Sequence, residues 1–133
     1  MSVDASEAFN ARRLDDYYGA FTPDVEYHGS GGLELRGVDA LRSHYGNFLT
    51  AFPDLRILLQ QVVVDAETGW IATLQVESGT HNGDFVTPAG VVPATGRPFS
   101  IVGTLFVRIN KVGLVSEVFE TGDRMAITEQ LFG

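Results

Sequence analysis

The chain of 133 residues contains no cysteine. Disulfide bonds, thiolate zinc sites and cysteine nucleophiles are therefore excluded, and the absence agrees with a reducing cytosol. Basic residues are also scarce: nine Lys and Arg accompany seventeen Asp and Glu, which leaves a net charge of -8. Nucleic acid and anionic membrane surfaces both require clustered positive charge, so we expect neither as a partner.

Long apolar segments are missing as well. No stretch approaches the ~20 apolar residues of a membrane helix. Residues 1–7 are acidic and lack the apolar centre of a signal peptide. We therefore expect a cytoplasmic protein. A chain of this length predicts a single domain over residues 1–133, which buries roughly two-thirds of its unfolded surface.

Only three histidines are present, and their spacing does not match a metal site. His28, His44 and His81 form no HxH or HExxH pattern, so we expect no metal. His44 falls within an amphipathic pattern and is expected on its solvated side. The serines lack the strand–turn–helix setting of a nucleophile elbow, which argues against a serine hydrolase.

Hydrophobic periodicity changes at Pro53. Between Gly37 and Pro53 the apolar residues recur at helical spacing and predict a helix over residues 38–52. From Leu55 onward they alternate, which is typical of strands. The expected strands span residues 25–28, 55–64, 70–78, 99–109 and 114–121. A short closing helix is expected over residues 123–131. Helices first and long antiparallel strands afterwards predict an α+β domain with the helices on one face of a sheet.

Short motifs follow one another along the chain. They are Phe52-Pro53-Asp54-Leu55, Gly79-Thr80-His81-Asn82-Gly83, Pro93-Ala94-Thr95-Gly96-Arg97, the run from Glu117 to Asp123, and Gln130-Leu131-Phe132-Gly133. In this order they resemble the SnoaL-like polyketide cyclases of the nuclear-transport-factor-2-like (NTF2-like) superfamily. The resemblance covers roughly residues 8 to 133.

The resemblance implies a cone-shaped barrel made of a strongly curved, mostly antiparallel sheet, with N-terminal helices packed on it and a deep pocket. It favours a cofactor-free enzyme with lyase- or isomerase-type acid/base chemistry. The implied reaction is an intramolecular aldol or related proton transfer on an aromatic or polyketide-like carbonyl compound. Such a substrate needs no cofactor, because its extended conjugation stabilises the enolate. The expected ligand is small and hydrophobic or aromatic.

Asp123 is the leading catalytic candidate. In the resembled family an aspartate at this place, four residues after an aromatic residue, acts as the acid/base, and Phe119 holds the aromatic position here. A carboxylate beside an apolar pocket is disfavoured in its charged form, so its pKa can rise toward neutrality. Asp123 also precedes a predicted helix, where aspartate is a common N-cap. Both roles remain open.

Further pocket residues follow from the resemblance. His81, between glycines that allow close backbone approach, is the second catalytic candidate, either polarising a carbonyl or bonding across a strand end. Expected substrate-binding residues are His28, Tyr45, Phe48, Trp70, Glu117 and Phe119. Glu117 shares strand parity with Phe119, but alternation alone does not say which face lies inward, and Gly122 can mark a bulge.

Two departures weaken the transfer of cyclase chemistry: Phe119 replaces the usual tryptophan, and residues 107–109 carry no histidine. A ketosteroid-isomerase-like site fits poorly, because Tyr27 and Leu105 fall where the base and the donor belong. An epoxide-hydrolase-like site would use Arg108 and Asp123 but lacks a third member. A non-catalytic ligand-binding or dimerisation module is the remaining alternative. An exposed curved sheet leads us to expect a homodimer.

Overall fold

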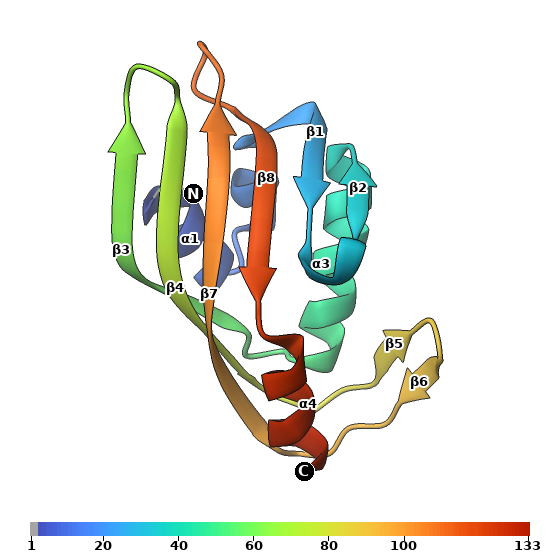
Figure 1. Ribbon diagram of the computed structural model, residues 1–133. Coiled ribbons are helices and arrows are strands. Elements are labelled where there is room, and N and C mark those ends of the chain that lie inside the picture. Colours follow the sequence, from blue (N-terminus) through green and yellow to red (C-terminus); the bar gives the residue numbers. More distant parts are fainter. Residues whose placement is uncertain (1–2) are drawn as a thin grey trace.

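The protein is built on a six-stranded mixed sheet with helices on one face (Figure 1). The computed structural model describes residues 3–133. Its elements are α1 (Val3–Asn10), α2 (Leu14–Tyr18), β1 (Phe21–His28), the 3-10 turn η1 (Ser30–Gly32), β2 (Glu34–Arg36), α3 (Val38–Ala51), β3 (Arg56–Asp65), β4 (Trp70–Thr80), β5 (Phe85–Thr87), β6 (Gly90–Val92), β7 (Pro98–Ile109), β8 (Val115–Gly122) and α4 (Arg124–Phe132). None of the helices in this described part is both long and apolar enough to cross a membrane.

The strands follow the order β2-β1-β8-β7-β4-β3. The β1–β8 pair is parallel and the other neighbours are antiparallel. Within residues 3–133 the sheet is open, so the predicted closure into a cone-shaped barrel is not found. Closing a barrel requires the two edge strands to pair. Here one edge is β2, whose three residues offer few ladder bonds to the ten-residue β3.

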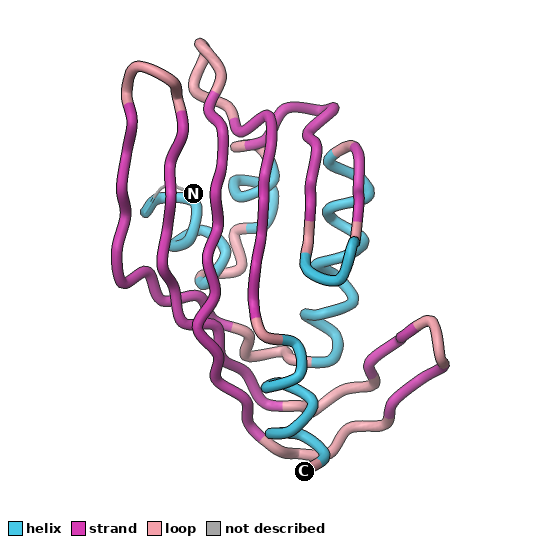
Figure 2. The backbone as a smooth tube through the Cα atoms, in the orientation of Figure 1, coloured by secondary structure: helices cyan, strands magenta, loops and turns pink. Residues whose placement is uncertain are grey.

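Burial alternates along β7 and shows that the sheet has one covered face and one exposed face. Phe99, Ile101, Leu105 and Val107 are buried, and the residues between them are exposed except for Gly103. This pattern arises when one face of an antiparallel sheet packs on a core and the other meets water. Figures 1 and 2 show α1 and α3 behind the sheet, on the covered side. The expected helix–sheet packing is confirmed, with Leu41 of α3 fully buried.

A β-bulge in β8 decides which of its side chains face the helices. The pairing of β8 with β7 shifts register near its start, so Val115 and Val118 are both buried although they stand three apart. Beyond the bulge, Glu120 points to the helix side, whereas Glu117 and Phe119 point to the opposite face. An extra residue in one strand reverses the parity of everything that follows.

The chain after β4 is held tightly against the end of α3. The N–H groups of Asn82 and Gly83 both donate to the carbonyl oxygen of Ala51, each at 3.1 Å. A Cβ atom at Gly83 would lie 2.0 Å from the carbonyl oxygen of Thr50, so only glycine fits this close approach. The β5–β6 hairpin follows, beside α3, and α4 lies at the end of β8 (Figure 1).

Candidate active site

A cavity of about 270 Å³ lies between the covered face of the sheet and helices α3 and α4. Its volume falls just below the ~300–1,000 Å³ that is usual for small-molecule sites. Tyr45 and Phe48, expected as pocket residues, line it. The other aromatic lining residues are Phe9, Tyr17, Tyr27, Phe52, Phe85, Phe99 and Phe132. The wall suits a compact apolar or aromatic ligand.

Two carboxyl groups lie in this apolar wall. Glu77 comes from β4 and Glu120 from β8. The Glu77 Oε1 atom accepts a hydrogen bond of 2.8 Å from Gln75 Nε2, and the Glu120 Oε2 atom accepts one of 2.6 Å from the Tyr27 hydroxyl. Strand alternation places Gln75 and Glu77 on one face of β4, so the fold directs both side chains inward. A buried carboxyl group is costly unless it has partners or a task.

The surroundings of Glu77 favour its protonated form. Burial, first, and then the negative charge of Glu120 raise the pKa of Glu77 above its usual value, while the hydrogen bond from Gln75 acts in the opposite direction. A carboxyl group with a raised pKa is a stronger base when ionised and a usable acid when protonated. Glu77 therefore has the properties of a group that both takes and returns a proton.

Three tyrosines surround these carboxyl groups. The Tyr45 ring centroid lies 6.2 Å from that of Tyr27 and 6.1 Å from that of Tyr17. Burial is the main cause that raises the pKa of all three hydroxyls above the ordinary tyrosine value. They consequently stay protonated at neutral pH; Tyr27 donates to Glu120, and the hydroxyls of Tyr17 and Tyr45 can donate inside the cavity.

His81 lies elsewhere along the cavity wall and is completely buried. Its backbone N–H donates to the Arg97 carbonyl oxygen at 2.9 Å, and its Nδ1 atom accepts the Thr95 N–H at 3.3 Å. The ring contacts Phe52 and Phe132, with centroid distances of 5.3 and 6.3 Å. Its Nε2 atom is buried and has no hydrogen-bond partner within residues 3–133.

The family model for SnoaL-like polyketide cyclases matches residues 3–131, nearly the whole chain. The chain belongs to this family. A comparison with curated proteins found no match. The motifs that suggested the resemblance thus identified the family correctly.

Solved structures of SnoaL-like and NTF2-like proteins share the fold. IdmH from Streptomyces antibioticus, a candidate polyketide cyclase, is 26% identical, with 95% of this chain and 91% of that chain covered and a TM-score of 0.78. AclR from Streptomyces galilaeus, a candidate hydroxylase, is 20% identical over 96% and 89%, with a TM-score of 0.80. An NTF2-like protein of unknown function from Exiguobacterium sp. 255-15 is 21% identical over 93% and 99%, with a TM-score of 0.72.

Asp123, the leading catalytic candidate, lies outside the cavity lining of this SnoaL-like protein. Its side chain is exposed, and its Oδ1 atom accepts the N–H of Ala126 at 3.1 Å, which makes it the N-cap of α4. The expected burial at the pocket wall is therefore not found. The cap geometry explains the position, because it directs the carboxylate toward the free N–H groups of the helix. A catalytic role for Asp123 stays a prediction.

Four further candidates lie on the opposite face of the sheet. His28, Trp70, Glu117 and Phe119 are not among the cavity-lining residues. The Phe119 ring stacks on His28 at 4.4 Å, and Trp70 stacks on Phe106 at 4.9 Å. The bulge in β8 turns Glu117 and Phe119 to the face opposite the cavity. Trp70 lies on that face because it has the opposite parity to the inward-facing Gln75 on β4.

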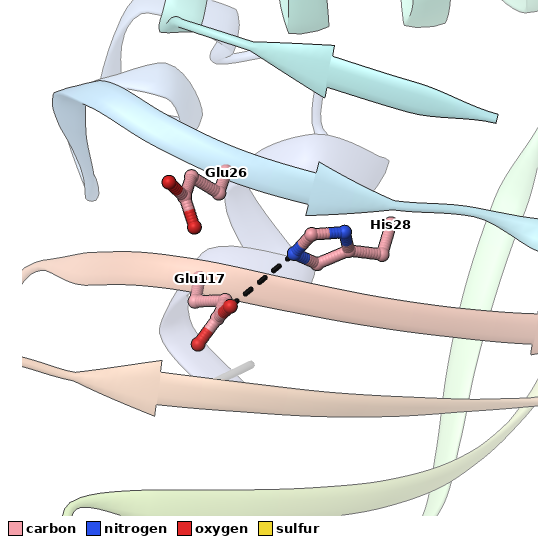
Figure 3. Close-up of side chains that lie close together, drawn as sticks. All are labelled: Glu26, His28 and Glu117. Atoms are coloured by element: carbon pink, nitrogen blue, oxygen red, sulfur yellow. Dashed lines mark hydrogen bonds and ion pairs between the residues drawn. The ribbon is translucent and has the colours of Figure 1, made fainter.

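Glu26, His28 and Glu117 form the one group in the described part of the chain whose side chains could hold a metal ion (Figure 3). Their candidate ligand atoms lie within 4.8 Å of one another. However, His28 already contacts Glu34 through Nδ1 and Glu117 through Nε2, the latter at 3.2 Å. Slight burial lowers the pKa of His28, but these two contacts outweigh it and raise the pKa overall. Glu26 in turn pairs with Arg36 at 3.7 Å, so each member of the cluster already has an ion-pair partner.

The two cavity carboxyl groups were missed by the sequence interpretation. Glu77 lies on the parity of Thr73 and Gln75, which looks polar and therefore solvent-facing when read alone. Glu120 was not singled out, because alternation alone does not say which face of β8 lies inward and the sequence does not locate the bulge opposite Arg108 and Ile109. The pairing of β4 with β7 would have identified Glu77, because it places Glu77 opposite the buried Ile101. That register is a property of the folded sheet.

Proposed function

We propose that this SnoaL-like protein is an enzyme that transfers protons on a small aromatic or polyketide-like carbonyl compound, ending in an intramolecular aldol ring closure or a related isomerisation. The observation that carries the proposal is Glu77, a half-buried carboxyl group of raised pKa that lines an apolar cavity beside the Tyr27–Glu120 pair. Buried titratable groups of this kind concentrate at catalytic sites. No cofactor takes part in the proposed steps.

In the proposed reaction Glu77 is the acid/base. Its carboxylate removes the proton next to a substrate carbonyl: the carbon–hydrogen bond breaks, an O–H bond forms on Glu77, and the electron pair moves onto the carbonyl oxygen as an enolate. The Tyr45 hydroxyl donates to that oxygen. The enolate carbon then attacks a second carbonyl carbon, and Glu77 returns its proton to the resulting alkoxide. Catalysis follows from a base of raised pKa and a donor kept in place.

Glu120 supports this arrangement without reacting. The Tyr27 hydroxyl holds one of its oxygens at 2.6 Å, so its charge stays beside Glu77. That charge makes a proton on Glu77 more favourable, which strengthens Glu77 as a base. Glu77 takes the role that the family pattern suggests for Asp123, because Glu77 lines the cavity and Asp123 is exposed.

Proton exchange tests the proposal without knowledge of the natural substrate. 2-Tetralone, a bicyclic aromatic ketone with acidic protons next to its carbonyl, is incubated with the protein in D2O, and loss of those proton signals is followed by NMR. We expect the wild-type protein to accelerate exchange. Glu77→Gln should lower the rate at saturating ketone by about 10²–10⁴-fold, the usual contribution of an acid/base residue.

The control is Glu67→Gln, which makes the same change in the exposed turn between β3 and β4 and should leave exchange unaltered. Wild-type protein that binds 2-tetralone without accelerating exchange would support the non-catalytic ligand-binding alternative. Equal exchange rates for wild-type and Glu77→Gln protein would contradict the acid/base role of Glu77.

A further inference from the structure

We propose that His81 forms a second polar subsite of the cavity, in which its Nε2–H group donates a hydrogen bond to an oxygen of the ligand. The ligand class is then an elongated fused-ring compound with two oxygen functions. One is the carbonyl that reacts at Glu77, and the other is an acceptor oxygen that meets His81. This inference rests on the proposed function for the end of the ligand at Glu77.

The hydrogen bonds of His81 determine where its proton lies. The Thr95 N–H can only donate, so Nδ1, at 3.3 Å, must be the acceptor and carries no proton. The Thr95 hydroxyl, 3.1 Å from the same atom, can donate to it as well. A neutral imidazole with an unprotonated Nδ1 has its proton on Nε2. The structure therefore assigns His81 as a hydrogen-bond donor at Nε2.

That donor has no partner within residues 3–133, although its ring is completely buried. Nearly all buried polar groups in folded proteins are hydrogen-bonded, and an unpaired one costs free energy. His81 belongs to the wall of the cavity, where Phe52 and Phe132 flank its ring. An acceptor oxygen of a ligand in the cavity would remove this cost, whereas a hydrocarbon group would not.

The backbone around His81 is fixed before any ligand arrives. Its N–H donates to Arg97, and its carbonyl oxygen accepts the Gly96 N–H at 2.8 Å. The next residues, Asn82 and Gly83, are tied to Ala51 at the end of α3. A donor held on such a frame loses little freedom when a ligand binds, which favours specificity for an oxygen at one place.

Chain geometry sets an upper limit on the length of the ligand. His81 is the first residue after β4 and follows Glu77 by four residues, and both residues line the cavity. Residues four apart in a strand are at most about 13 Å apart between Cα atoms, because each adds about 3.3 Å. At a separation close to this limit, the two side chains can contact opposite ends of a compound with two or three fused rings. The cavity volume of about 270 Å³ suits a ligand of that size.

A pair of matched ligands tests the subsite. 6-Methoxy-2-tetralone and 6-ethyl-2-tetralone have nearly the same size and shape, but only the methoxy compound carries an acceptor oxygen at the end opposite the ketone. NMR titration should show that wild-type protein binds the methoxy compound roughly two- to tenfold more tightly, the scale of one hydrogen bond. In His81→Phe the preference should vanish. An unchanged preference in His81→Phe, or none in the wild type, would overturn the inference.

A second measurement needs no variant and so remains decisive if His81→Phe does not fold. In protein labelled with 15N, long-range proton–nitrogen spectra distinguish a protonated from an unprotonated ring nitrogen. We expect His81 to carry its proton on Nε2, and the Nε2 signal to shift with the methoxy compound but not with the ethyl compound. A proton on Nδ1, or an equal response to both ligands, would refute the assignment.

These measurements are separate from the test of the proposed function. If the protein prefers the methoxy compound but does not exchange the ketone protons, the oxygen subsite stands and the catalytic role of Glu77 fails. If it exchanges those protons without any preference, Glu77 keeps its role and the subsite at His81 fails. In the first case the compound with two oxygen functions would be a ligand that the protein binds without converting it.

Discussion

At the residue scale, the position of one carboxyl group relative to the cavity separates a structural role from a chemical one. Asp123 and Glu77 are both acidic, yet Asp123 is exposed and caps α4, whereas Glu77 lies in an apolar wall. The first accepts a helix N–H from Ala126 and is exposed to water. Burial destabilises the anion of the second and raises its pKa.

The raised pKa of Glu77 predicts a pH-dependent effect on stability. Folding favours the protonated carboxyl group, so its contribution to stability is full below the unfolded pKa of about 4.3 and is lost as pH rises through the higher folded pKa. Glu77→Gln removes that loss. We expect the variant to melt at a higher temperature than the wild type, with a difference that grows as pH rises from the unfolded pKa of about 4.3 through the higher folded pKa. A difference that stays constant over this range, or favours the wild type, would exclude a buried carboxyl group of raised pKa.

Asp123→Asn separates the two roles considered for that residue. Asparagine caps a helix as well as aspartate does, so we expect almost no change in melting temperature, whereas Asp123→Ala should cost about 0.5–2 kcal/mol. We also expect Asp123→Asn to keep the exchange activity toward 2-tetralone. A fall in exchange of about 10²–10⁴-fold with an unchanged melting temperature would instead establish Asp123 as an acid/base.

At the element scale, close contact between the end of α3 and the segment after β4 positions His81. Gly83→Ala should destabilise the protein by roughly 1–3 kcal/mol, because its Cβ atom would overlap the backbone oxygen of Thr50 and force the segment to move. Chemical denaturation measures the change. NMR signals of His81 should shift as well, since its strand end moves with the segment.

Gly46→Ala is the matched control, with the opposite expected sign. A Cβ atom at Gly46 would meet no atom of the described residues within 4 Å, and the residue lies inside helix α3. Alanine is favoured over glycine in a helix by roughly 0.5–1 kcal/mol, so this variant should be more stable than the wild type. Similar losses in both variants would mean that tight packing against Thr50 is not the cause.

At the scale of the whole molecule, the sheet face opposite the helices remains apolar and exposed. Leu58, Leu74, Val102, Phe106 and Phe119 lie on this outer face and are between 38% and 58% exposed. A monomer seldom leaves so many apolar side chains together in water. The outer face therefore supports the expected homodimer, since a two-fold interface uses the same patch on both copies.

Light scattering coupled to size-exclusion chromatography tests this expectation. Wild-type protein should elute as a dimer, and Phe106→Glu, which puts a charge at the centre of the outer face, should elute as a monomer. Val112→Glu is the control, because Val112 is 78% exposed in the β7–β8 turn, away from that face. A wild-type monomer, or a dimer unaffected by Phe106→Glu, would count against this interface.

The sequence alone determined the family, the fold class and most element positions. The periodicity around Pro53, the two hairpins and the cap at Asp123 are local features, because spacing and turn chemistry act between neighbours along the chain. Tertiary structure decided the site. Glu77, Glu120 and Tyr27 come together only through strand register and the bulge in β8, which sequence alternation does not reveal. Burial also depends on the fold. The surroundings of Glu77 raise its pKa, and within residues 3–133 those of His81 leave its Nε2 atom without a partner.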